Sequence, residues 1–119
     1  MSFSDNQVDL LAKVAGMMSK RHDVIAANIA NVNTPNYRAK EMDFEEEFHR
    51  LLNRGDRQGA LDVEAEIRED DTTPLRADGN NVLVEKEMGQ MYRNSLVGSV
   101  FGQLLKSRLE LIRMAINGR

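Results

Sequence analysis

The feature that most constrains this chain is the spacing of apolar residues, alternately three and four positions apart, at both of its ends. In the N-terminal stretch the spacing runs from Val8 to Val32 and includes Ile25 and Ile29. This spacing is typical of the seam of a coiled-coil helix. Pro35 disfavours the helical conformation in the residue before it. The sequence therefore predicts a first long helix over residues 5–32.

The same spacing returns at the C-terminal end and predicts a second long helix over residues 85–117. Its seam consists of Met88, Met91, Ser95, Gly98, Gly102, Leu105, Leu109, Ile112 and Ile116. Two long helices joined by a middle segment favour an all-α, elongated molecule. We expect the N- and C-terminal helices to form an antiparallel, coiled-coil-like pair.

The middle segment, residues 33–84, has weaker patterns. Apolar residues on one face, including Phe44 and Phe48, predict a short helix that ends near Gly55. Strict alternation of apolar and charged residues over 61–68 predicts a half-buried extended strand. We therefore expect residues 1–119 to form a single unit with a short helix and an otherwise irregular or extended middle.

The two long helices carry more apolar surface than one pair can cover. Small residues at Ser95, Gly98 and Gly102 would let another helix approach closely. Second apolar stripes lie beside both seams, at Leu10, Val14, Met17 and Val24, and at Val97, Val100, Phe101, Leu104 and Leu111. A contiguous exposed apolar patch usually marks an interface. We expect packing against other copies or related proteins, and the alternative is that the middle segment folds back over the second stripe.

Residues that carry chemistry are sparse. The chain has no Cys and only two His, His22 and His49, far apart in the sequence. We therefore expect no metal site and no cofactor, and an enzyme is the least favoured class. A net charge of −3 without a basic stripe argues against nucleic acid as a partner. The longest uncharged run, Asn94 to Leu105, has 12 residues. A transmembrane helix needs about 20 residues, so we expect no membrane span.

The end of the first helix has the most distinctive local sequence, from Ala27 to Arg38. Asn31 can cap the helix end, and Pro35 fixes the direction in which the chain leaves. Tyr37 offers a ring with a polar tip. An ordinary helix stop explains these residues equally well. A second turn cluster, with Asp78, Gly79 and Asn80, precedes the last helix.

This segment resembles the signature of the bacterial flagellar axial proteins, the family of rod, hook and hook-junction subunits. The matching residues are Asn28, Asn31, Thr34, Pro35, Tyr37 and Arg38. Asn36 stands where the family usually has Gly, and Asn is the next best residue for a positive φ angle. The segment around Asp78, Gly79 and Asn80 resembles the lead-in to the last helix of proximal rod members.

The resemblance implies a structural subunit of the rod that crosses the periplasm and transmits torque, with both terminal helices in the inner tube. It implies export through the flagellar type III apparatus without a cleaved signal peptide, which agrees with the uncharged start of the chain, Met1 to Ser4. The implied neighbours are further copies of the chain, FlgC-like rod proteins, a FliE-like adaptor and the MS ring. A soluble coiled-coil adaptor or export chaperone that binds a partner helix in a groove is the alternative.

Overall fold

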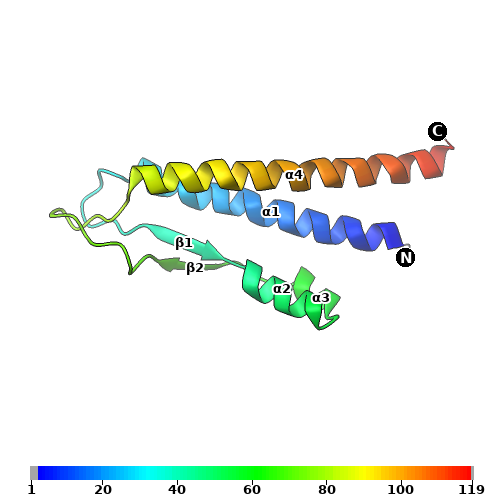
Figure 1. Cartoon of the computed structure of the whole chain (residues 1–119), viewed down its shortest axis with the longest axis horizontal. Coiled ribbons are helices and arrows are strands. Elements are labelled where there is room, and N and C mark those ends of the chain that lie inside the picture. The colour runs from blue at the N-terminus through cyan, green and yellow to red at the C-terminus, as the bar shows by residue number, and fades with distance from the viewer. Residues whose placement is uncertain (1–2, 119) are drawn as a thin grey trace.

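The protein is an elongated molecule of two long helices and a smaller arm (Figure 1). The computed structural model describes residues 3–118, and the side chains from residue 7 onward. Along the chain come α1 (Phe3–Ala30), β1 (Lys40–Asp43), α2 (Glu45–Asn53), α3 (Arg57–Leu61), β2 (Glu66–Glu69) and α4 (Val84–Asn117). The principal extents are 63 × 31 × 15 Å. The predicted fold of two long, paired terminal helices is confirmed.

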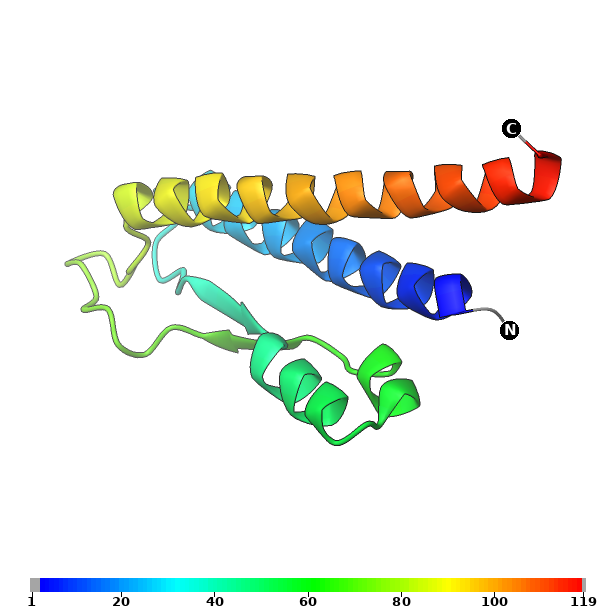
Figure 2. The same ribbon diagram turned by 45° about the vertical axis from the view of Figure 1, so that its right-hand side comes forward.

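α1 and α4 run antiparallel in direct contact near the end where the chain turns (Figure 1). Toward the two termini they diverge, and this is visible in both views (Figure 2). α4 begins one residue before its predicted start and ends where predicted. α1 ends at Ala30, two residues earlier than predicted, because residues 31–33 already form turns.

The contact between α1 and α4 uses only part of the predicted seam of α4. Met91, Gly98 and Leu105 are half-buried. The most buried residues of α4 are polar, Glu87 and Asn94, and the Nδ2 of Asn94 donates to the Met18 carbonyl over 2.8 Å. The face turned toward α1 is therefore rotated slightly from the predicted one, because two polar side chains occupy positions that an apolar pattern cannot indicate.

The middle of the chain forms an arm that packs against α1, on the side away from α4 (Figures 1 and 2). β1 and β2 pair antiparallel, with Met42 opposite Ile67. α2 and α3 follow one another at the end of this ribbon. The short helix was predicted, whereas β1 was not. The strand predicted over 61–68 is wrong in part, because Leu61 ends α3 and the strand begins only at Glu66.

The apolar core lies between α1 and the arm. Its buried members are Val14, Met17, Met18, Met42, Phe44, Leu51, Ala60 and Val63, with Leu10 and Val24 packed beside them. The second stripe of α1 is thus covered by the folded-back middle segment, as the alternative interpretation held. The second stripe of α4 has no such cover. Leu104 is 47% exposed and Val100 57% exposed.

Candidate functional site

Residues that were singled out in two separate turn segments come together at one end of the molecule. The segment after α1 contains Asn31, Thr34 and Tyr37, and the segment before α4 contains Asp78 to Asn80. They meet beside the first turn of α4 and the start of β1. We call this hydrogen-bonded group the polar clasp, and its members are Asn28, Asn31, Thr34, Asn36, Tyr37, Arg76, Asp78, Gly79, Asn80 and Glu87.

Asn28 lies at the centre of the polar clasp and has no exposed surface. Its Nδ2 donates to the Lys40 carbonyl over 2.9 Å and to Glu87 Oε2 over 3.1 Å. Its Oδ1 accepts from the Tyr37 hydroxyl over 3.0 Å and from the Lys40 amide over 2.9 Å. Every donor and acceptor site of the amide is occupied. One side chain therefore joins α1, β1 and α4.

Asn80 joins the two turn segments in the same manner and is also fully buried. Its Nδ2 donates to the carbonyls of Asn31 and Thr34, each over 2.9 Å. Its Oδ1 accepts from the Val82 amide over 2.7 Å. Two carbonyls just beyond α1, which also accept hydrogen bonds from the backbone amides of Thr34 and Tyr37, are thus tied to a side chain that lies 46 to 49 positions later in the chain.

Two residues of the polar clasp have the positive φ angles that the turn requires. Asn36 has φ 64° and Gly79 has φ 81°. The Asn36 amide donates to the Asp78 carbonyl over 2.8 Å. A Cβ on Gly79 would lie 2.3 Å from Asn36 Oδ1, so only Gly fits here. Asn36 adopts the conformation predicted for it, and Pro35 is exposed.

Arg76 belongs to the polar clasp although the sequence did not single it out as a site residue. Its guanidinium donates to the Val82 carbonyl over 2.8 Å and also to the carbonyl of Val32. Its amide donates to the Asn80 carbonyl over 2.7 Å. In the sequence, only its position two residues before Asp78 could have indicated this role.

A second polar group, centred on Asp70 and Asn81, continues from the polar clasp toward the arm. Asn81 accepts from the Ala39 amide over 2.7 Å and donates to the Asp70 carbonyl over 2.8 Å. Burial opposes ionisation of Asp70, but hydrogen bonds from Thr73, Thr72 and then Lys86 outweigh it. They hold the pKa of that carboxyl well below its usual range.

Glu87 is the acidic residue inside the polar clasp and is 3% exposed. Burial raises the pKa of its carboxyl, and the hydrogen bond from Asn28 does not fully offset this effect. The pKa of Tyr37 is also raised, first by burial and then by the negative charge of Glu87. The ionised carboxylate of Glu87, buried between α1 and α4, therefore lowers the stability of the folded state.

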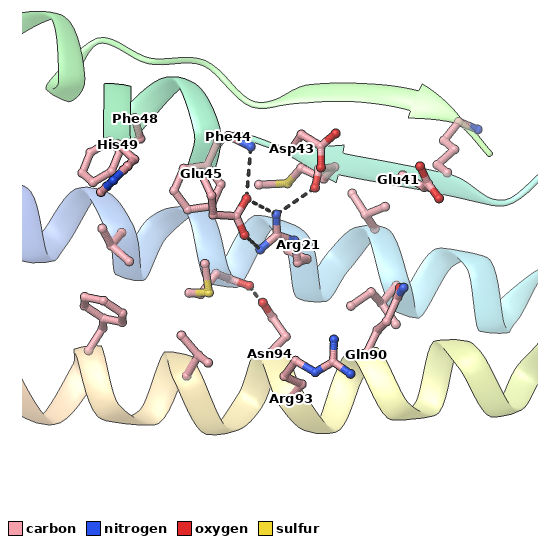
Figure 3. A pocket seen from close by; sticks show the side chains of 18 residues that line it. Arg21, Glu41, Asp43, Phe44, Glu45, Phe48, His49, Gln90, Arg93 and Asn94 are labelled. Atoms are coloured by element: carbon pink, nitrogen blue, oxygen red, sulfur yellow. Dashed lines mark hydrogen bonds and ion pairs between the residues drawn. The ribbon is translucent and has the colours of Figure 1, made fainter. Parts of the chain in front are cut away.

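Arg21 attaches the arm to α1 (Figure 3). Its Nη1 and Nη2 lie 2.5 and 2.6 Å from the two carboxylate oxygens of Glu45, and Nη2 also donates to the Met42 carbonyl over 2.7 Å. The guanidinium lies 5.4 Å from the centre of the Phe44 ring. Burial opposes ionisation of Glu45, yet the Arg21 hydrogen bonds leave the pKa of Glu45 lowered. No motif or spacing in the sequence indicated this pairing.

The residues predicted to pack between subunits divide into two groups. Ile25 is buried inside the molecule, and Ile29, Gly98, Leu105 and Ile112 are half-buried. A Cβ on Gly98 would lie 3.5 Å from Met18 of the same chain. The exposed members are Ser95, Gly102, Leu109 and Ile116.

Two apolar faces of α4 are incompletely covered among residues 7–118. The first, which we call the outer stripe, consists of Val97, Val100, Leu104, Leu111 and Met114, all exposed. The second, which we call the C-terminal stripe, consists of Leu105, Leu109, Ile112 and Ile116. A Cβ on Gly102 would meet no atom within 4 Å, and a shallow hollow of about 300 Å³ lies beside it.

Neither a three-ligand metal site nor a helix that could cross a membrane occurs in the described part of the chain. Among those residues, no three His, Asp or Glu side chains are grouped so that they could hold a metal ion. None of the described helices is both long enough and apolar enough to cross a membrane. The distinctive features are a buried polar joint and uncovered apolar helix faces.

Comparison with known proteins assigns these features to a class. The family model described as "Flagella basal body rod protein" matches residues 18–38, which include Asn28, Asn31, Thr34 and Tyr37 of the polar clasp. The fold and this segment therefore define the class of flagellar basal body rod proteins.

Individual relatives narrow the class further. The flagellar basal body rod protein FlgB of Borrelia hermsii is 30% identical over 98% of this chain and 99% of its own length. FlgB of Aeromonas hydrophila is 31% identical over 84% of both chains. FlgB of Bacillus subtilis is 26% identical over 99% of this chain and 98% of its own. The chain belongs to the FlgB family of structural proteins of the flagellar basal body rod.

Proposed function

We propose that this rod protein polymerises through its terminal helices at the proximal end of the rod and so helps to form the torque-transmitting shaft. The outer stripe of α4 is the observation that carries the proposal. Its five apolar side chains are exposed by 38 to 57%. Fully burying one such side chain contributes about 1.5–3 kcal/mol. Because these side chains are already partly buried, a neighbouring helix that covers the stripe would gain roughly half of that free energy for each of them.

The small residues of α4 support a close helix–helix contact. Gly102 and Ser95 are exposed, and side-chain atoms added at Gly102 would meet nothing in the same molecule. Small residues at an interface let two helix backbones approach closely. Gly98 serves the same purpose within the chain, against α1. We assign Gly102, not Gly98, to the contact between subunits.

The polar clasp supports the proposal through rigidity. It fixes the angle between the helix pair and the arm with buried, fully hydrogen-bonded side chains. Buried polar networks that are fully satisfied rigidify a structure. A subunit of a shaft under torque requires such a fixed joint.

The neighbours that we propose are further copies of the chain, FlgC-like rod proteins, a FliE-like adaptor and the MS ring. Delivery would be by the flagellar type III export apparatus, without signal-peptide cleavage, into a rod that spans the periplasm. We propose residues 1–119 as one structural unit without catalytic function. The sequence similarity to FlgB proteins over nearly the full chain supports this placement.

A deletion strain tests the proposal. Loss of the gene is expected to abolish swimming and to leave basal bodies without a rod, and the parent sequence should restore both. The double variant Val100→Lys/Leu104→Lys should fail to restore them, whereas Ser99→Lys should succeed, because Ser99 is exposed and lies about 100° or more around α4 from Val100 and Leu104. Equal unfolding midpoints of the purified parent and variant would exclude misfolding. Rods that persist in the deletion strain, or full rescue by the double variant, would overturn the proposal.

A further inference from the structure

Charge is strongly segregated along this chain. Residues 40–70, which form the arm, contain eleven acidic and five basic residues, a net charge of −6. Residues 93–118 of α4 and its C-cap contain four basic residues and one acidic residue, a net charge of +3. Opposite potentials on two surfaces steer association and fix its orientation. The arm is therefore net acidic, and the C-terminal part of α4 is net basic.

An open groove lies where the arm meets the helix pair, and we call it the arm groove (Figure 3). Its volume is about 590 Å³, and residues from α1, β1, α2 and α4 line it. Its apolar lining includes Val24, Phe48, Val97 and Phe101, and Val97 also belongs to the outer stripe. Sites of about 300–1,000 Å³ accommodate whole small ligands, so several apolar side chains fit here.

The rim of the arm groove carries charges of both signs. Glu41, Asp43 and Glu45 line it and form ion pairs with Arg68, Lys86 and Arg21 of the same chain. Arg21, Lys40 and Arg93 also line it, and the side chains of Asp43 and Glu45 are each more than half exposed. Further exposed carboxylates of the arm, such as Glu46, lie close to them in the sequence. An apolar centre in the occupant would match the apolar lining, and basic flanks would match the net negative charge of the arm.

The C-terminal end of α4 has this composition. The C-terminal stripe is flanked on one side by Arg108 and on the other by Lys106 and Arg113, given 100° per residue. No ion pair involves these three side chains among residues 7–118. Ile116 is 77% exposed and Leu109 49% exposed. The segment is thus a basic, amphipathic helix end without a complete partner.

The same molecule cannot use this segment to fill its own arm groove. The α4 residues that line the groove end at Phe101. Beyond that point α4 diverges from α1, and α1 lies between α4 and the arm (Figures 1 and 2). The segment from Leu105 to Asn117 therefore points away from the arm of its own chain.

We propose that the arm groove is the docking site for residues 105–117 of α4 from a second copy of this chain. The contact joins two different surfaces, so each copy keeps one free groove and one free helix end. Such a head-to-tail contact generates rings or open helical assemblies, whereas an isologous contact stops at a dimer. The inference rests on the proposed function and specifies one contact through which copies add to one another.

Site-specific cross-linking tests the contact. Because the chain has no native cysteine, only the introduced thiols can react. His49→Cys places a thiol in the lining of the arm groove, and Ile116→Cys places one on the C-terminal stripe. The two full-length variants are mixed and treated with a short bis-maleimide. We expect the mixed conjugate to exceed both homoconjugates. As a matched control, Tyr92→Cys, which is exposed on α4 outside the groove, should give little conjugate with Ile116→Cys.

Charge reversal provides a second test. Lys106→Glu with Arg113→Glu on the Ile116→Cys chain should lower the association constant between the two copies about tenfold, and the yield of the mixed conjugate should fall with it. That factor corresponds to two exposed ion pairs of about 0.7 kcal/mol each. A yield equal to the Tyr92 control, a dominant Ile116–Ile116 conjugate, or an unchanged yield after charge reversal would overturn the docking proposal.

The outcome can be separated from a failure of the proposed function. If the conjugate is absent while the gene still proves necessary for the rod, the docking contact is wrong and the role as a rod subunit stands. If rods form normally in the deletion strain, the proposed function itself fails. Binding of the helix end to vesicles of anionic phospholipid, in preference to a second copy, would also overturn the docking contact.

Discussion

At the scale of single residues, the protein depends on a few buried polar side chains whose hydrogen-bonding capacity is fully used. Asn28 and Asn80 are each fully buried and connect segments that are far apart in the chain. A buried polar group that loses its partner retains the full penalty of desolvation. Substitutions of these residues should therefore lower the free energy of unfolding by more than the loss of a side chain of this size would by itself.

Asn28→Ala should lower the free energy of unfolding by about 2–3 kcal/mol, because the Lys40 amide and carbonyl and the Tyr37 hydroxyl would lose their partner. Urea denaturation followed by circular dichroism measures the change. Asn33→Ala is the control, since Asn33 is exposed and its loss should alter stability by less than about 0.5 kcal/mol. Equal midpoints for the two variants would contradict the role given to Asn28.

Glu87→Gln should stabilise the protein at pH 7. Because the folded pKa of Glu87 is raised above 4.5, its ionisation destabilises the folded state as the pH rises through and above that value. Gln removes this loss and can still accept the hydrogen bond from Asn28. The advantage over the parent should vanish as the pH falls below about 4.5. Unfolding curves at a series of pH values test this, with the exposed Glu85→Gln as the control.

At the scale of elements, α1 packs against other parts of the chain on two faces, whereas α4 does so on one. One face of α1 packs on α4 and another packs on the arm, so its apolar stripes are both used. α4 contacts α1 along one face only and leaves the outer stripe exposed. The arm is attached to α1 through the apolar core, through the hydrogen bonds of Asn28 to β1 and through Arg21.

Arg21→Gln should loosen the arm while the helix pair stays intact. The change removes both hydrogen bonds to Glu45 and one to the Met42 carbonyl. The partly exposed ion pair contributes about 1 kcal/mol at most. Hydrogen–deuterium exchange should become faster in β1, β2 and α2 but not in the half of α4 that faces α1. Lys20→Gln, one position away and exposed, should leave all segments unchanged.

The two glycines Gly98 and Gly102 should respond in opposite ways to the same substitution. Gly98→Leu should destabilise the isolated chain by about 1–3 kcal/mol, because the new side chain would meet Met18. Gly102→Leu should stabilise it by up to about 1 kcal/mol through helix propensity, since nothing lies within 4 Å. Thermal unfolding of the two variants measures both. A loss of stability at Gly102 would show that its face is already covered within one molecule.

At the scale of the whole molecule, the long periodic elements could be predicted from the sequence and the parts fixed by tertiary contacts could not. The predicted and observed bounds of α4 differ by one residue, because its apolar period is sustained over many turns. β1 has four residues and one apolar side chain, Met42, so its pairing with β2 leaves almost no pattern. Glu87 and Asn94 also escaped prediction, because a hydropathy pattern assigns polar residues to the surface.

The candidate site, like the fold, could be predicted only in part. The turn residues around Asn28 and Asn80 could be singled out, because Asn, Pro and Gly have specific roles in turns. The hydrogen bonds between the two turn segments could not, because they join positions 42 or more residues apart. Assembly through α4 requires that the outer stripe is open in a free subunit and covered in the rod.

Thiol labelling at the outer stripe tests that requirement most directly. The chain has no native cysteine, so Val100→Cys and Leu104→Cys each introduce a single reporter. In the purified subunit both thiols should react with a soluble maleimide as quickly as an exposed thiol. In isolated basal bodies they should react only after the rod is dissociated in denaturant. Equal labelling rates in free subunits and in intact rods would contradict the claim that this face is the assembly surface.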